Sequence, residues 1–201
     1  MGDRELPRAE DDLTPDRAVA PGEAPVDSRR VTPSRRLSQA ISEGDGISLI
    51  VPVERSEAAR AAEADGAEAL LAHGDAIPEI REASSLPVVS YYVSGAPAAD
   101  ACIVGADADW EHLHALDIEI VVRVEQDDEL EQALEQHDPE IFVLAGGQAE
   151  ERLGRVLSLL SDVPAGKLAI AELPGVTQEE IDELERAGCD AVLVGASGSE
   201  R

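Results

Sequence analysis

The sequence predicts an α/β fold, a shortened TIM-type (β/α)8 barrel that follows a disordered acidic N-terminal tail. Two observations lead to this prediction. Eight apolar runs recur between residues 47 and 196, and most of the gaps between them carry a helical pattern of charged and apolar residues. Continuous apolar strands that alternate with amphipathic helices are typical of a parallel sheet covered by helices. Eight such units indicate that the sheet closes into a barrel.

The chain divides into residues 1–30 and residues 31–201. The first segment is rich in Pro, Asp, Glu and Arg and has almost no apolar periodicity. It cannot bury enough apolar surface to offset the entropy lost on ordering, so we predict a disordered acidic tail. The second segment begins with a short leading helix, for which Thr32 is a suitable cap and Pro33 a suitable first residue. Leu37 and Ile41 lie on one face of this helix, which ends near Gly44.

The expected strands follow in order. They are the runs at residues 47–53, 68–72, 86–93, 101–106, 118–124, 141–145, 167–173 and 191–196. Helical patterns fill residues 56–66, 127–136, 149–160 and 177–188.

Two features complicate this assignment. The repeats span about 150 residues, whereas a typical barrel has about 250. Residues 94–100, "SGAPAAD", are too short and too rich in Pro and Gly for a full helix. An open doubly wound sheet is the alternative, but the eight-fold count favours a trimmed barrel. Thin helical cover over the third and fourth strands would expose apolar surface, which suggests a homo-oligomer.

The charge of the chain limits its partners. The formal net charge is −27, with 43 acidic and 16 basic residues, and Lys167 is the only lysine. A nucleic acid or an anionic membrane would be repelled, so neither is expected as a partner. An acidic, lysine-poor chain with aliphatic strands is typical of a halophilic, high-salt cytoplasm, although an acidic protein from a GC-rich genome has a similar composition.

No cofactor or metal is expected, and the predicted location is the cytoplasm. Cys102 and Cys189 lie in or beside apolar runs without metal-ligand spacing, so we expect two free core thiols. His112 and His114 are two residues apart on an expected helix and point in different directions. No apolar run reaches about 18 residues, and the N-terminus has no signal-peptide pattern.

Two stretches resemble one known family. "VVRVEQDDELEQAL", residues 121–134, is similar to the fifth strand and helix of indole-3-glycerol phosphate synthase, a barrel enzyme of tryptophan biosynthesis. "ELPGVTQEEIDELERAGCDAVLVGA", residues 172–196, resembles the seventh and eighth units of the same family. The resemblance extends over residues 35–197. It implies a (β/α)8 barrel and a lyase that closes the indole ring with decarboxylation.

The residues that carry out the family reaction have been replaced here. In the resemblance, the catalytic lysine of the third strand falls on Tyr91, a first-strand lysine on Glu54 and the fifth-strand glutamate on Arg123. Only the seventh-strand glutamate remains, as Glu172. Ring closure needs a general acid, and arginine does not release its proton in proteins.

Two functional interpretations therefore remain. The first is a divergent pseudoenzyme that has lost the reaction and binds a phosphorylated small molecule or acts as a partner or scaffold protein. The alternative is an active carbon–carbon lyase that uses Glu172, Tyr91 and Arg123.

Arg123 is the residue that needs explaining. Strand alternation places Val121, Arg123 and Glu125 on one face, which the resemblance directs into the barrel. An unpaired arginine there would be costly, so it needs an anion. Three interpretations remain open: an ion pair with Glu54 or Glu172, a bound ligand carboxylate or phosphate, or a guanidinium that reaches solvent at the strand end.

A phosphate site is expected at the loops after the seventh and eighth strands, as in many barrels. The backbone N–H groups that would form it belong to Gly175, Gly195, Ala196 and Ser197. The other interpretation is that these residues only make turns. Tyr91 either hydrogen-bonds a ligand or fills space at the end of the third strand.

Overall fold

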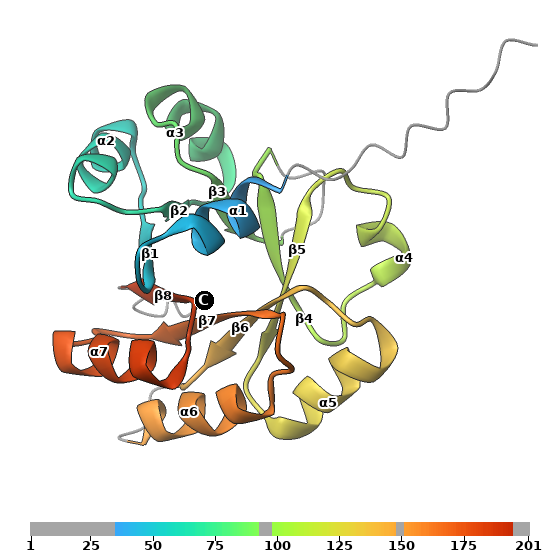
Figure 1. The fold of residues 1–201 in the computed structure, drawn as a ribbon. Helices are drawn as coiled ribbons and strands as arrows, with labels where there is room; N and C mark the ends of the chain where they lie inside the picture. Colours follow the sequence, from blue (N-terminus) through green and yellow to red (C-terminus); the bar gives the residue numbers. More distant parts are fainter. Residues whose placement is uncertain (1–34, 93–97, 148–150, 195–201) are drawn as a thin grey trace, which may run out of the picture. The chain divides into compact units, whose positions relative to one another are not determined.

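Eight parallel strands close into a barrel, as the sequence predicted. The computed structural model describes residues 35–92, 98–147 and 151–194. Each strand pairs with its neighbours in sequence, and β8 pairs with β1 (Figure 1). All eight predicted apolar runs contain one strand. The strands are β1 Ser48–Pro52, β2 Ala69–Leu71, β3 Val88–Tyr91, β4 Ala101–Gly105, β5 Glu119–Val124, β6 Ile141–Ala145, β7 Leu168–Leu173 and β8 Ala191–Val194.

The helices lie between the strands and are unequal in length. They are α1 Arg36–Glu43, α2 Ser56–Ala64, α3 Ile77–Ala83, α4 Trp110–Leu113, α5 Asp127–Gln136, α6 Arg152–Asp162 and α7 Gln178–Ala187, with a 3-10 turn, η1, at Gly74–Ala76. The barrel is shortened around β3 and β4. Only nine residues separate Tyr91 at the end of β3 from Ala101 at the start of β4, and α4 has only four residues.

The ends of α7 show why the helices form where they do. Thr177 and Glu180 form a capping box, in which each side chain accepts a hydrogen bond from the backbone N–H of the other residue. Gly188 ends the helix with a φ of 89°, a conformation that glycine adopts without steric cost. The connection to β8 therefore turns at once, and β8 begins at Ala191.

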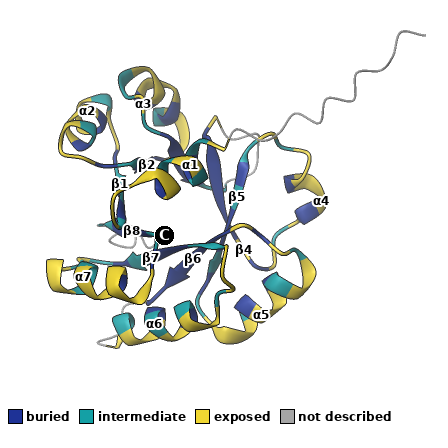
Figure 2. Cartoon of the chain, viewed as in Figure 1, coloured by how far each residue is buried: buried dark blue, intermediate teal, exposed yellow. Residues whose placement is uncertain are grey.

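The strands are buried on both faces. Side chains that alternate along each strand fill the lumen, and those between them pack under the helices; Val121 belongs to the lumen cluster and Val122 to the outer cluster. Figure 2 shows strands that are largely buried beneath helices with exposed outer faces. The core is aliphatic, as expected from an aromatic content of 2%. Cys102 and Cys189 are buried and free, as predicted.

Helix α1 closes the amino-terminal end of the barrel. Leu37 and Ile41 belong to the lumen cluster, so this helix buries its apolar face at the ends of the strands. Glu119, at the start of β5, accepts hydrogen bonds from the backbone N–H groups of Leu37 at 2.7 Å and Ser38 at 3.0 Å. A carboxylate at a helix N-terminus satisfies free N–H groups and complements the helix dipole.

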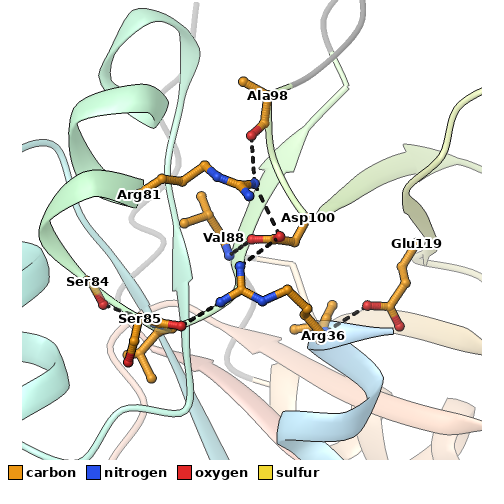
Figure 3. A network of polar contacts seen from close by, with 10 residues as sticks. Arg36, Arg81, Ser84, Ser85, Val88, Ala98, Asp100 and Glu119 are labelled. Carbon is orange, nitrogen blue, oxygen red and sulfur yellow. Dashed lines mark hydrogen bonds and ion pairs between the residues drawn. The ribbon is translucent and has the colours of Figure 1, made fainter. Parts of the chain in front are cut away.

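A buried aspartate fastens α1 to β3 and α3 (Figure 3). Asp100 accepts from Arg36 at 2.9 Å, and its other oxygen accepts from the backbone N–H of Val88 at 2.9 Å. Arg81 of α3 also pairs with this carboxylate at 3.2 Å. Because Asp100 has two cations and a backbone donor, its burial at 4% exposure is compensated.

Some sequence predictions lie outside the described residues. The acidic tail at residues 1–30 belongs to this group, and the boundary between residues 30 and 31 stays a prediction. The predicted start of the leading helix, with Thr32 as cap and Pro33 as first residue, is wrong, because α1 begins at Arg36 with Arg35 as its N-cap. In the part of the chain that is described, no helix combines the length and apolar character needed to cross a membrane.

Candidate active site at the mouth of the barrel

The carboxyl-terminal ends of three strands bring Tyr91, Arg123 and Glu172 together. The Tyr91 hydroxyl donates to Oε1 of Glu172 at 2.6 Å, and Nε of Arg123 donates to Oε2 at 2.5 Å. The Glu172 side chain is 13% exposed. Both carboxylate oxygens thus have a donor, and the position of this carboxylate is set from two sides.

Barrel closure creates this cluster. Arg123 lies on β5 beside Val143 of β6, and Glu172 lies on β7 beside Ala145 of β6, so only one strand separates them. Tyr91 ends β3, which is four strands away from β7 in a ring of eight. The phenol therefore reaches Glu172 across the lumen.

Arg123 contacts a second carboxylate. Its Nη1 donates to Glu125, which lies two residues further along the chain. The backbone N–H of Glu125 is in turn held by the side chain of Glu129 at 2.6 Å. Within the described residues, Nη2 of Arg123 has no hydrogen-bond acceptor. The guanidinium is positioned by two carboxylates and keeps donors for a ligand.

Of the interpretations proposed for Arg123, the ion pair with Glu172 is present. Glu54 lines the same cavity, but in the described part of the chain it forms no ion pair with Arg123. A catalytic role for any of these residues stays a prediction.

A cavity of about 1410 Å³ lies over the cluster. Its charged lining comes from five acidic residues and two arginines, namely Glu54, Arg55, Asp107, Arg123, Glu125, Glu129 and Glu172. It exceeds the range of about 300–1,000 Å³ that is usual for small-molecule sites. Among the residues described, no cluster of three or more His, Cys, Asp or Glu side chains could hold a metal ion.

His73 is a site residue that sequence reasoning missed. It follows the end of β2 and lines the cavity, where its ring stacks on Tyr91 with centroids 5.8 Å apart and planes 6° apart. The available signal was position, because His73 comes just after an apolar run, where barrels carry their functional side chains.

The cluster fixes the protonation of its donors. Burial, reinforced by the hydrogen bond and negative charge of Glu172, raises the pKa of the Tyr91 phenol far above its ordinary value. Burial alone would lower the pKa of Arg123, but the charge of Glu172 and the hydrogen bonds that the guanidinium donates to both carboxylates leave it raised. At neutral pH the phenol is protonated and the guanidinium is charged. The arrangement offers a carboxylate base, a weak acid and a cation around one point.

The expected phosphate loops are only partly described. Gly175 follows β7 and has a φ of 63°, a conformation that favours glycine. Gly195, Ala196 and Ser197 lie outside the described residues. The turn at Gly175 explains that glycine by itself, and phosphate binding stays a prediction.

No protein-family model matches this sequence, and no curated protein matches it either. Solved structures do resemble it. N-acetylmannosamine-6-phosphate 2-epimerase from Clostridium perfringens is 18% identical, with a TM-score of 0.59 over 75% of this chain and 86% of that one. A putative phosphonomutase from Burkholderia cenocepacia is 14% identical, with a TM-score of 0.55 over 75% and 87%. 2,3-dimethylmalate lyase, of the PEP mutase/isocitrate lyase superfamily, is 14% identical, with a TM-score of 0.54 over 83% and 82%. These likenesses show the TIM-type fold.

The predicted relationship to indole-3-glycerol phosphate synthase is wrong. The structural neighbours are an epimerase, a phosphonomutase and a lyase of another superfamily, and no family model supports the prediction. The stretches that carried the resemblance are a buried strand, a capped acidic helix and a glycine stop before the next strand. Buried parallel strands followed by helices are shared by all barrels of this type, whatever their function. A place in tryptophan biosynthesis and the loss of catalytic lysines both presuppose this relationship and have no support without it.

Proposed function

We propose that this protein is an enzyme that transfers a proton on a small polar carbonyl or hydroxy compound, with Glu172 as the base. One observation carries the proposal: Glu172 lies between the Tyr91 hydroxyl and the Arg123 guanidinium inside the mouth cavity. Support comes from the fold, because the structural neighbours named above are enzymes and barrels of this type have their active sites at the carboxyl ends of the strands.

The residues have distinct roles in this proposal. Glu172 removes a proton from a carbon next to a carbonyl, and negative charge develops on the carbonyl oxygen. Nη2 of Arg123 donates to this charge, and the hydroxyl of Tyr91 is released from Oε1 as Glu172 becomes protonated and then donates to the same oxygen. Glu172 then returns the proton to carbon. His73 packs against the Tyr91 ring and limits its movement.

The names of the structural neighbours suggest the class of substrate that we propose. Their names include a sugar phosphate and a branched hydroxy acid. We propose a phosphorylated sugar or a short hydroxy acid, with Gly175, Gly195, Ala196 and Ser197 as the phosphate-binding residues in the first case.

Hydrogen exchange tests this function without knowledge of the product. The protein is incubated in D2O with N-acetylmannosamine 6-phosphate or 2,3-dimethylmalate, and loss of each carbon-bound proton is followed by NMR. We expect exchange with one of the two compounds, and about a 100-fold or greater loss of rate in Glu172→Gln, as for removal of a general base. Glu54→Gln, in the same cavity but outside the cluster, is the control. Equal exchange rates in wild type and Glu172→Gln would exclude Glu172 as the base.

A second candidate is a protein that binds a phosphorylated small molecule without converting it. One observation favours it: both Glu172 oxygens already accept hydrogen bonds, so neither is free in the resting cluster to take a proton from a substrate. The same compounds would then raise the melting temperature but show no exchange. A rise in melting temperature accompanied by exchange would contradict this candidate.

A further inference from the structure

Glu129, in the first turn of α5, lines the mouth cavity and holds the end of β5. Its Oε2 accepts a hydrogen bond at 3.2 Å from the backbone N–H of Gln126, the N-cap residue of the helix. The same oxygen accepts from the backbone N–H of Glu125 at 2.6 Å. In a capping box the glutamate accepts from the N-cap residue. The shorter bond therefore goes to a residue that lies outside the helix.

Helix α7 shows how the same box looks without this extra bond. Glu180 occupies the position in α7 that Glu129 occupies in α5, and it accepts from the backbone N–H of Thr177, its N-cap residue, at 2.8 Å. In the described part of the chain, Glu180 accepts from no backbone N–H ahead of Thr177. Helix capping alone therefore does not account for the bond between Glu129 and Glu125.

The backbone of Glu125 is also held from α6. Nη1 of Arg155 donates to the carbonyl oxygen of Glu125 at 3.5 Å and to Oε1 of Gln126 at 3.3 Å. The N–H group of Glu125 thus has a partner on α5 and its carbonyl group has a partner on α6. The side chain of Glu125 consequently extends from a backbone that is fixed from two helices.

This fixed backbone matters because the side chain of Glu125 orients Arg123. A guanidinium group is planar and rigid. Its Nε donates to Glu172 at 2.5 Å, and that bond alone would let the plane turn about it. The second bond, from Nη1 to Glu125, removes this freedom and sets the direction of Nη2. The Glu125 side chain is 47% exposed, so the ion pair adds little to stability and its main effect is on orientation.

We propose that Glu129 is a positioning residue for the proton transfer proposed above. It holds Glu125, and Glu125 holds the guanidinium of Arg123 so that Nη2 points to the oxygen on which negative charge develops. Glu129 itself does not touch the substrate. This role rests on the proposed function, but the orientation of Arg123 can be measured without any substrate.

The first test follows the guanidinium of Arg123 by NMR in the full chain. Rotation about the Nε–Cζ bond exchanges Nη1 with Nη2, and Arg123→Lys identifies the signals by their loss. We expect separate Nη signals in the wild type and about tenfold faster rotation in Glu129→Ala, because the bond that holds Glu125 is gone. Rapid exchange of the two signals in the wild type, or unchanged rotation in Glu129→Ala, would overturn the proposal.

Glu180→Ala is the matched control for this measurement. It removes the same glutamate from the capping box of α7, where the described contacts do not include Arg123. The rotation should stay as slow as in the wild type. Circular dichroism checks that each variant is folded. Equally fast rotation in Glu180→Ala would show that loss of any helix cap loosens Arg123, and would contradict a specific role for Glu129.

The second test measures proton exchange in D2O with the compound that the wild type exchanges. We expect kcat to fall about 10–100-fold in Glu129→Ala while KM stays within about twofold, because a misdirected donor is missed only in the transition state. Glu129→Gln keeps an oxygen that can accept from both backbone N–H groups, so it should retain most of the rate. Glu131→Ala, at an exposed position of α5, is the control and should change neither constant.

The outcomes separate this role from the proposed function. A rise in KM at constant kcat in Glu129→Ala would mean that Glu129 contacts the substrate, which contradicts positioning. Loss of exchange in Glu172→Gln with full activity in Glu129→Ala would leave the proposed function intact and exclude the role of Glu129. If the wild type exchanges neither compound, the proposed function fails, and the NMR signals of Arg123 still decide whether Glu129 orients the guanidinium.

Discussion

Arg123 shows how a strand that is otherwise core can carry a charge. Its guanidinium contacts Glu172 and Glu125, and its side chain remains 30% exposed at the carboxyl end of β5. The desolvation cost is therefore partial, and two carboxylates offset it. A fully buried ion pair loses about 3–5 kcal/mol when one partner is removed, whereas an exposed pair is worth about 0–1 kcal/mol. The Arg123–Glu172 pair should lie between these limits.

A double-mutant cycle measures this pair. We expect Arg123→Met to lower the free energy of unfolding by about 1–3 kcal/mol, because it leaves Glu172 without its cation. In the double variant Arg123→Met/Glu172→Gln, the loss should be smaller than the sum of the two single losses by about 1 kcal/mol or more. Urea denaturation gives the values. Arg123→Met/Glu54→Gln is the control and should be additive; additivity in the Glu172 pair would show that the contact contributes nothing.

Tyr91 gives the cluster a dependence on high pH. The folded pKa of the phenol is raised, so the folded state holds this proton more tightly than the unfolded state does. The stabilisation is complete below the ordinary phenol pKa of about 10 and is lost as the pH rises above it. In a Tyr92→Phe background, tyrosinate absorbance should not appear until the protein unfolds. Adding Glu172→Gln removes the neighbouring charge and should bring ionisation to lower pH; an unchanged titration would exclude Glu172 as a contributor to the shift.

The sequence predicted Tyr91, Arg123 and Glu172 as site residues, but part of the reason for that prediction was wrong. They emerged from a comparison with a family to which the structure gives no support. Their grouping has a simpler cause, since each lies at or near the carboxyl end of a strand. The contact between His73 and Tyr91 could not be derived from the sequence, because ring geometry across β2 and β3 depends on how the barrel closes.

At the scale of elements, the strands and most helices were predictable, whereas α3 was not, and α4 was expected only as the helix that carries His112 and His114. Every strand is flanked by buried surface on two sides, so it appears as a continuous apolar run. The helices α3 and α4 have seven and four residues. Neither is long enough to display a 3.6-residue period over several turns, which is the signal that identifies a helix in sequence.

The docking of α1 depends on one carboxylate at its N-terminus. Glu119→Gln removes the charge but keeps one oxygen that can accept a hydrogen bond. We expect a loss of about 1–2 kcal/mol in the free energy of unfolding, together with about tenfold faster hydrogen exchange in α1. Glu43→Gln, at the exposed far end of the same helix, is the control and should leave exchange unchanged. Unaltered protection of α1 in Glu119→Gln would mean that Leu37 and Ile41 hold the helix unaided.

For the whole molecule, the net charge of −27 is the property that governs how stability depends on salt. The charge cannot be neutralised internally, because 43 acidic residues face 16 basic ones. Several described arginines are already paired, as at Asp100 and Glu180. The surplus carboxylates repel one another in the compact state, and unfolding lets them move apart. Stability should therefore rise with salt, even though individual exposed ion pairs weaken.

The size of the stabilisation by salt, and its dependence on the cation, distinguish two explanations of that stabilisation. The screening length falls from about 10 Å at 0.1 M salt to about 3 Å at 1 M, so simple screening should act mostly below 1 M. We expect a gain of about 2 kcal/mol, or roughly 4–8 °C in melting temperature for a chain of this size. Sodium, potassium and choline chlorides should be equivalent if screening is the cause. A further rise in molar potassium chloride, absent with choline, would instead indicate specific hydration of the acidic surface and support the predicted halophilic origin. Light scattering along the same series tests the proposed homo-oligomer, since mutual repulsion would keep subunits apart at low salt. A melting temperature that falls with every salt would mean that local ion pairs outweigh the net charge.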